Sequence, residues 1–334
     1  MNVANENLKQ LLSEYEKKRE NAIRLAELQK ENLYGKIPRL AEIDQEISLL
    51  TIQTSKALLQ QKDAPFLDEF QRKLEKLRAE KEKIFQKNKI EKSFFEPHFS
   101  CEHCQDTGYI TDENFHTTMC NCLKQQLFDL EYNKSNVYQL AHQNFENFKF
   151  DFYSTKNNSE KYHSDLSPRE NIKLIYDICQ TFLEDFDDPT EKNLLFTGNT
   201  GLGKTFLSSC IANELLKKGK TVLYQTAPIM LDEIINSRFS KNTKVENLYE
   251  HLLNVDLLII DDLGTECMNQ MKFTELFNII NTRLLNQKST KTIISTNLSL
   301  QNLYANYDER IVSRLVGYYH ICYFFGEDIR FQLN

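Results

Sequence analysis

Glycine, proline and long hydrophobic runs are scarce in this 334-residue sequence. With only 9 glycines and 6 prolines, a glycine-rich pattern has little chance of arising by accident. Apolar runs such as Leu257–Ile260 are far too short to cross a bilayer. The first residues are polar and lack the apolar core of a signal peptide. We therefore expect a cytoplasmic protein with no membrane partner.

Charge is distributed unevenly along the chain, whose formal net charge is −7. Residues 1–96 hold 19 Lys and Arg against 17 Asp and Glu, whereas the remaining residues hold 22 against 31. This acidic balance excludes bulk nucleic-acid binding by the larger part, so any such contact must come from local patches. An apolar content of 40% is sufficient for a sizeable core in a chain long enough for two domains.

Residues 1–95 have apolar residues at helical spacing and few helix breakers. The segments Gly35–Pro38 and Asp63–Pro65 interrupt the pattern, which predicts three amphipathic helices. These would form either a helical bundle or an antiparallel coiled coil. Such apolar stripes most often serve internal packing, but a small helical module beside an ATPase is also a common docking surface. We predict a partner-binding helical region here.

Four cysteines form two close pairs, Cys101-Glu-His-Cys104 and Cys120-Asn-Cys122, separated by 15 residues. Without an export signal, this spacing favours a structural Zn²⁺ site with four thiolates over disulfides. A site with three cysteines and one histidine stays open, because three histidines are nearby: His98, His103 and His116. The surrounding residues are acidic, which argues against a strong contact with nucleic-acid phosphate.

The segment Gly198-Asn199-Thr200-Gly201-Leu202-Gly203-Lys204-Thr205 fits the phosphate-loop pattern G-x-x-x-x-G-K-[ST]. An apolar strand precedes it and a helical stretch follows, which is the context that such a loop requires. Backbone N–H groups and the helix N-terminus would surround the phosphate oxygens of ATP. Lys204 would reach the β- and γ-phosphates, and the Thr205 hydroxyl would ligate Mg²⁺. The alternative is a glycine-rich turn with an exposed lysine.

Two further apolar strands run into polar residues. Asp261 and Asp262 end the first of them, and Asn297 follows the second. Because ligands bind at the carboxyl ends of parallel strands, Asp261 would hold Mg²⁺ and Asp262 would orient the attacking water. Asn297 would help to hold that water or sense the γ-phosphate. The alternatives are an acidic turn for the aspartates and a helix cap or turn for Asn297.

Three arginines near the end of the sequence complete the candidate site. Arg310 and Arg314 are four residues apart and share a helix face. Arg314 is the candidate arginine finger, offered to the nucleotide of a neighbouring subunit to stabilise charge on the transferred phosphoryl group. A solvated helix with a Glu–Arg pair is the alternative. Arg330, after the last strand, would contact the γ-phosphate in its own subunit.

Strands and helices alternate from Lys192 onward. We expect strands at 193–197, 221–226, 257–261, 292–296 and 320–325, and helices at about 204–218, 228–252 (broken), 269–288 and 299–316. This order predicts an α/β P-loop NTPase core with a parallel sheet covered on both faces. The predicted divisions are a helical partner-binding region at 1–95, a zinc-binding module at 96–130, a connector at 131–190 and an ATPase domain at 191–334.

Five motifs taken together resemble those of DnaI/DnaC-type bacterial replicative helicase loaders, which are AAA+ ATPases related to the IstB transposition helpers. The motifs are Gly198–Thr205, Leu257–Glu266, Ser295–Asn297, Asp308–Leu315 and Gly326–Arg330. This resemblance covers roughly residues 140–334. The cysteine pattern also looks like the zinc-bearing region of the DnaI branch, which extends the resemblance to most of the chain.

The resemblance implies an AAA+ domain that binds single-stranded DNA and self-associates through Arg314, with Asn297 as sensor 1 and Arg330 as sensor 2. The N-terminal region would bind the hexameric replicative helicase, and the ATP state would time helicase loading in replication initiation. Because Asp262 stands where most AAA+ enzymes have Glu, we predict slow hydrolysis. The alternatives are an IstB-like transposition or phage accessory ATPase acting with a recombinase, and a zinc-bearing scaffold with a degenerate ATPase.

Overall fold

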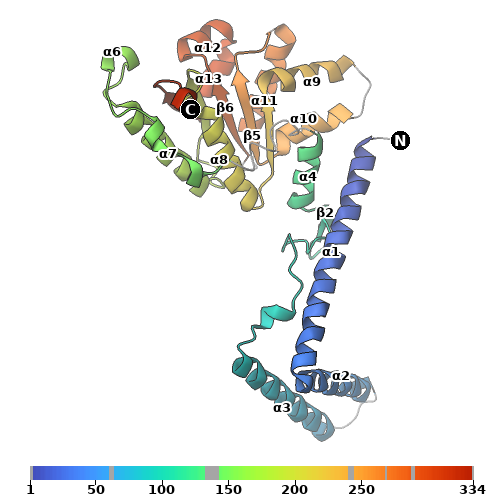
Figure 1. Ribbon diagram of the computed structural model, residues 1–334. Coiled ribbons are helices and arrows are strands. Elements are labelled where there is room, and N and C mark those ends of the chain that lie inside the picture. Colours follow the sequence, from blue (N-terminus) through green and yellow to red (C-terminus); the bar gives the residue numbers. More distant parts are fainter. Residues whose placement is uncertain are drawn as a thin grey trace. The chain divides into compact units, whose positions relative to one another are not determined.

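The computed structural model describes residues 3–59, 64–131, 143–239, 244–267, 269–286 and 290–332 (Figure 1). The chain divides into two compact units, one of residues 9–118 and one of residues 119–334 together with the first eight residues. Within the described ranges, no helix is both long enough and apolar enough to cross a membrane. The four divisions proposed from the sequence stay a prediction.

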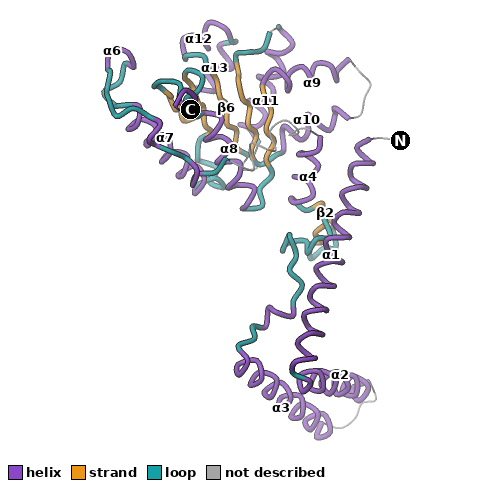
Figure 2. Tube along the Cα trace, viewed as in Figure 1, coloured by secondary structure: helices purple, strands orange, loops and turns teal. Residues whose placement is uncertain are grey.

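Three helices follow one another at the start of the chain, as predicted: α1 (Val3–Lys36), α2 (Pro38–Leu59) and α3 (Ala64–Asn88). Figure 2 draws α1, α2 and α3 as helices. The join between α1 and α2 falls at Ile37, because Pro38 has no N–H to donate and is favoured at the start of a new helix.

The helices α2 and α3 pack side by side as a hairpin (Figure 1). Leu40 and Ile43 of α2 are fully buried. Two ion pairs join the helices: Arg39 Nε lies 2.8 Å from Glu80 Oε1, and Lys81 Nζ lies 2.5 Å from Asp44 Oδ1. Arg39 also contacts two acidic side chains of its own helix, so the polar rim of the hairpin is an extended charge network.

A small two-stranded hairpin follows the three N-terminal helices in the sequence. The 3-10 helix η1 (Lys92–Phe95) is followed by β1 (Tyr109–Thr111) and β2 (Thr117–Met119). The helix α4 (Asn121–Glu131) comes next. Residues 132–142 of the predicted connector lie outside the described residues.

The larger unit contains a five-stranded sheet whose order is β4-β5-β6-β3-β7, and every pair of neighbouring strands is parallel. The strands are β3 (Asn193–Gly198), β4 (Val222–Thr226), β5 (Leu257–Leu263), β6 (Lys291–Thr296) and β7 (Tyr319–Phe324). The parallel α/β core predicted from the sequence is therefore confirmed, with each expected strand displaced by no more than two residues at either end.

Helices cover both faces of this sheet, because alternate residues of each buried strand point to opposite sides. They are α7 (Pro168–Glu184), α8 (Lys204–Lys217), α9 (Ala227–Phe239), α10 (Lys244–Asn254), α11 (Gln270–Leu285), α12 (Leu300–Asn306) and α13 (Glu309–Tyr318). Helices α7 and α8 share one apolar core with alternate strand residues, and α9 to α13 share the other. The short elements η2 (Phe145–Asn147), η3 (Phe150–Phe152), α6 (Ser159–Tyr162) and η4 (Ile329–Gln332) complete the unit.

The helix α4 lies along the edge strand β4. The Gln125 side chain accepts a hydrogen bond from Val222 N at 2.7 Å and donates one to Val222 O at 3.0 Å. The Asn121 amide donates to Gly219 O at 3.0 Å. Phe128 of α4 is buried in the core formed by α9 to α13. The side chains of α4 therefore satisfy backbone groups that an edge strand otherwise presents to water.

One expected helix, at 299–316, is wrong, because the structure has two helices there. Tyr307 is extended, with φ −117° and ψ 156°, and ends α12. The Asp308 carboxylate then accepts the Arg310 N–H at 2.9 Å and caps α13. Tyr307 is buried and its hydroxyl bonds the Glu266 carboxylate, a contact across 41 residues that the local helical pattern does not reveal.

Candidate functional site

The predicted phosphate loop connects β3 to α8, and α8 begins at Lys204. Gly198 and Gly201 have φ values of 137° and 72°, a region that side chains other than glycine rarely adopt. A Cβ atom at Gly198 would collide with the Phe324 carbonyl, and one at Gly201 would collide with the Asp328 carboxylate. Close packing against the end of the chain thus requires glycine at both positions.

The Lys204 ammonium group lies inside this loop. Its side chain is only 6% exposed, and Nζ donates to Gly198 O at 2.6 Å, Asn199 O at 2.7 Å and Asn297 Oδ1 at 2.8 Å. The loop lysine and the predicted sensor Asn297 are therefore in direct contact, although 93 residues separate them in sequence. The parallel pairing of β3 with β6 brings them together.

Burial lowers the pKa of Lys204 from 10.5 to about 8, and the charges of Asp261 and Asp262 partly oppose this shift. A bound triphosphate favours the protonated amine, so it should raise this pKa again. The protonation state of Lys204 and the occupancy of the loop are therefore linked.

ATP affinity should fall as the pH rises above about 8, because the free protein then loses the Lys204 proton that phosphate requires. The apparent dissociation constant should rise by up to about tenfold per pH unit, until the pKa of the complex is reached. Calorimetry in buffers of different ionisation enthalpy should detect proton uptake on binding in this range. Lys204→Arg should abolish the uptake, since arginine stays charged; equal uptake by both proteins would contradict the assignment.

Asp261 occupies the end of β5 and is 4% exposed. Its Oδ2 accepts the Thr205 hydroxyl at 3.1 Å and also the Tyr224 hydroxyl. Its Oδ1 accepts the Asp262 N–H at 3.1 Å and the Ser295 hydroxyl. The two predicted Mg²⁺ ligands, Thr205 and Asp261, are thus in contact. The sequence gives no sign of Tyr224, and it marks Ser295 only as the first residue of the Ser295–Asn297 motif, without a role. Strand register reveals the contact of each with Asp261.

Asp262 follows immediately in an unusual backbone conformation. Its φ is 55°, in the left-handed region, and the pairing of β5 with β6 shifts register between Ile260 and Leu263. Such an irregularity turns a side chain away from the regular alternation of a strand. Burial, and secondarily the charge of Asp261, raise the pKa of the Asp262 carboxyl above its ordinary value.

A cavity of about 420 Å³ lies over the phosphate loop. It is lined by Gln143, Thr200, Gly201, Leu202, Gly203, Lys204, Thr205, Phe206, Asp262, Asn297, Ile329 and Arg330. Three of these were not predicted: Gln143, Phe206 and Ile329. Gln143 reaches the cavity from a distant part of the sequence that no pattern marks, whereas Ile329 belongs to the Gly326–Arg330 motif but was given no role.

Arg330 lies at the cavity but is held by Asp328. Its Nε is 3.0 Å from Asp328 Oδ1 and its Nη2 is 2.8 Å from Asp328 Oδ2. The neighbouring Ile329 N–H donates to Gly201 O at 2.9 Å, so the end of the chain is joined to the phosphate loop. A phosphate in the cavity would meet a guanidinium group that is already oriented.

Arg314 is not brought to this cavity. It lies on α13, where Nε donates to Asn281 Oδ1 at 3.1 Å and the guanidinium group lies 5.4 Å from the centre of the Phe277 ring. Arg310 lies over the same ring at 5.0 Å. A role for Arg314 toward a neighbouring subunit stays a prediction.

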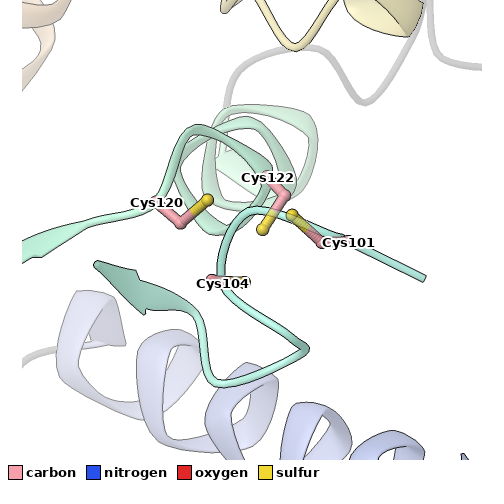
Figure 3. Close-up of side chains that lie close together, drawn as sticks. All are labelled: Cys101, Cys104, Cys120 and Cys122. Carbon is pink, nitrogen blue, oxygen red and sulfur yellow. The ribbon is translucent and has the colours of Figure 1, made fainter. Parts of the chain in front are cut away.

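The four paired cysteines form a separate cluster. The sulfur atoms of Cys101, Cys104, Cys120 and Cys122 all lie within 4.8 Å of one another, and Figure 3 shows two coming from a loop and two from the start of α4. A tetrahedral zinc site with Zn–S bonds of about 2.3 Å needs sulfurs about 3.8 Å apart, so the donor set fits this metal. None of the three nearby histidines belongs to the described cluster.

The loop that carries the first cysteine pair is held by Asp106. Its carboxylate accepts the backbone N–H groups of Ser100 at 2.8 Å and of Cys101 at 2.9 Å. The Gly108 N–H points to Cys104 Sγ at 3.4 Å. Hydrogen bonds of this kind orient thiolates toward a common centre.

The parallel sheet, the glycine loop and the strand-end carboxylates define the unit as an α/β P-loop NTPase. The family described as IstB-like ATP binding protein matches residues 139–333, which is more than half of the sequence. The chain belongs to this family.

The chain is similar to Replicative helicase loader DnaC of Escherichia coli (strain K12), with 28% identity over 137 residues, 41% of this chain and 55% of that protein. A protein of the same name from Buchnera aphidicola subsp. Baizongia pistaciae (strain Bp) is 30% identical over 158 residues, 47% of this chain and 61% of its own length. The chain thus spans little more than half of these relatives. A crystal structure described as the DnaC helicase loader shares 23% identity, covers 56% of this chain and 99% of its own, and has a TM-score of 0.43, a weak likeness.

Proposed function

We propose that this protein is an AAA+ ATPase that binds the replicative DNA helicase and single-stranded DNA, and that ATP binding and hydrolysis time helicase loading at replication initiation. The observation that carries the proposal is the single cavity in which Lys204, Asp262, Asn297 and Arg330 meet. The curated relatives named as helicase loaders support the choice of partner.

In this proposal the triphosphate lies against the loop, and Lys204 exchanges its carbonyl partners for phosphate oxygens. The Thr205 hydroxyl and the Asp261 carboxylate would hold Mg²⁺, which when bound would supply positive charge to the phosphates. Asn297 orients the attacking water, and Arg330 senses the γ-phosphate. Arg314 stabilises the transferred phosphoryl group from a neighbouring subunit, which makes self-association part of the function.

Asp262 accepts the proton of the attacking water. Its raised pKa makes it a stronger base than an exposed aspartate, but its side chain is one methylene shorter than glutamate. The left-handed backbone at φ 55° favours aspartate over glutamate there, because short polar side chains tolerate this region best. We infer slow hydrolysis, suited to a switch that spends most of its time in one nucleotide state.

The cysteine cluster is proposed to hold one structural Zn²⁺. Elemental analysis of the purified protein should find about one zinc per chain, and Cys104→Ser should weaken zinc binding at least about 100-fold. The matched control is Cys267→Ser, which changes an exposed cysteine outside the cluster and should leave the zinc content intact. A folded protein that lacks zinc, and whose melting temperature is insensitive to chelators, would contradict the proposal.

The helical hairpin offers a surface for the proposed helicase contact. Leu49 and Ile52 stand one helical turn apart on α2 and are 60% and 53% exposed. Apolar side chains so exposed, on an element that packs through its other face, are typical of a docking helix.

A pull-down with the replicative helicase of the same organism tests this function. The full chain should retain the helicase, and the double variant Leu49→Glu, Ile52→Glu should weaken that binding at least about tenfold. The control is Leu174→Glu, at an equally exposed leucine of α7 in the ATPase unit. No helicase binding by the unmodified chain, with or without ATP, would refute the loader function.

The second candidate is an IstB-like transposition or phage accessory ATPase acting with a recombinase. The family match favours it, because the description of that family names IstB. The cysteine cluster favours the loader, since transposition helpers of this type usually lack such a module. Capture of a recombinase instead of the helicase in the same experiment would decide for the second candidate.

A further inference from the structure

The Asp261 carboxylate is surrounded by hydrogen-bond donors on both of its oxygens. Oδ2 accepts the hydroxyls of Tyr224 and Thr205, and Oδ1 accepts the Ser295 hydroxyl and the Asp262 N–H. The proposed reaction gives Thr205 and Asp262 their own tasks. It leaves Tyr224 and Ser295 without one, although both are essentially inaccessible to solvent.

Strand register places these two hydroxyls. Tyr224 is on β4 and Ser295 is on β6, the two strands that flank β5. Thr226 of β4 pairs with Asp261, and Tyr224 stands two residues earlier on the same face, so its long side chain runs along the strand to the carboxylate. Asp261 is therefore held from both sides of its own strand.

The Tyr224 hydroxyl is a permanent donor. It lies on Oδ2 of Asp261, and a carboxylate oxygen can only accept, so the phenol must be the donor. A metal would bind the Thr205 hydroxyl through an oxygen lone pair, which would constrain the geometry of its contact with Oδ2. The Tyr224 hydroxyl then continues to fix the direction in which the carboxylate lone pairs point.

We propose that Tyr224 and Ser295 are positioning residues that hold the Asp261 carboxylate, one on each oxygen, and thereby set the affinity of the nucleotide site for Mg²⁺. Neither residue lines the cavity over the phosphate loop. Each acts through Asp261, as the partners of metal-ligating carboxylates do elsewhere, and their loss typically costs about 10- to 100-fold in metal affinity. This inference rests on the proposed nucleotide site, but not on the helicase or on hydrolysis.

The test is Mg²⁺-dependent binding of a fluorescent ATP analogue to the full chain. In Tyr224→Phe the Mg²⁺ concentration at half-maximal enhancement of binding should rise about tenfold or more. Binding in EDTA should stay within about twofold of the unmodified protein, because the substitution does not alter Lys204, whose ammonium group is held by Gly198, Asn199 and Asn297. Ser295→Ala should shift the Mg²⁺ midpoint in the same direction and provides the second test if the tyrosine variant fails to fold.

Tyr319→Phe is the matched control. Tyr319 is also a buried tyrosine of this sheet, but it lies on β7, which pairs with β3 at the edge of the sheet opposite β4. This variant should keep the Mg²⁺ midpoint of the unmodified protein. A folded Tyr224→Phe or Ser295→Ala with an unchanged midpoint would overturn the inference while leaving the proposed function intact. An unmodified protein that binds no nucleotide would instead overturn the proposed function.

Discussion

Lys204→Ala should raise the dissociation constant of ATP at least about 100-fold, because charge-assisted hydrogen bonds to phosphate are worth about 1.5–3 kcal/mol each and one ammonium group makes several. The loop, the cavity and the remaining residues would still be present, so the loss of ATP affinity would measure the contribution of the Lys204 charge. Titration with a fluorescent ATP analogue at pH 7 measures it, because this pH lies below the Lys204 pKa of about 8 and most of the lysine is protonated.

The control for this variant lies on the same helix. Lys217 ends α8, is exposed, and pairs with Glu214 at 2.7 Å. Lys217→Ala removes the same charge at a distance from the loop and should leave ATP affinity within about twofold, as expected for an exposed ion pair of small energy. Equal affinities of the Lys204→Ala and unmodified proteins would place the nucleotide elsewhere.

Asp262→Asn should lower the hydrolysis rate by about 10²- to 10⁴-fold, which is the usual contribution of a general base. Affinity for ATP should change little, because the amide has the shape of the carboxyl group. Asparagine also tolerates the left-handed conformation found at φ 55°, so the backbone should be preserved. Single-turnover hydrolysis of radiolabelled ATP separates the chemical step from product release.

The Asp262→Asn and Lys204→Ala variants should differ in a way that separates ATP binding from ATP hydrolysis. Asp262→Asn should bind ATP and fail to hydrolyse it, whereas Lys204→Ala should do neither at ordinary concentrations. In the helicase pull-down, the first variant should therefore resemble the unmodified protein held in its ATP state, and the second should resemble the protein without nucleotide. Hydrolysis by Asp262→Asn at the unmodified rate would assign the base to another residue.

Local patterns in the sequence predicted the elements that depend on local physics. The strands from β3 to β7 are short apolar runs between helical segments, and the phosphate loop is contiguous, so both can be read from neighbouring residues. The break between α12 and α13 could not, because the burial of Tyr307 against Glu266 decides it. The order of the strands in the sheet could not be predicted from the sequence either. A helical connection between two parallel strands does not determine on which side of the sheet the second strand is added.

The residues of the candidate site also fall into two groups: those that the sequence predicts and those that only the structure reveals. The structure gathers Lys204, Asp262, Asn297 and Arg330 at one cavity, as strand-end positions predict, while their chemical roles stay predictions. Tyr224 and Gln143 carry no sequence signal, and Ser295 is marked only as part of a motif, because their contacts at the site depend on strand register and tertiary packing. Supporting residues of this kind are identified from the register of neighbouring strands in the structure, and not from motifs in the sequence.

The cover that α4 provides for β4 has a consequence for dissecting this protein. Gln125 occupies the backbone groups of Val222 at the open edge of the sheet, and the same helix carries Cys122. A truncated chain that begins after residue 131 would keep every residue that lines the cavity, but it would uncover that edge, and a second molecule could add its own strand there. The smallest stable ATPase fragment must therefore begin before the cysteine-bearing helix.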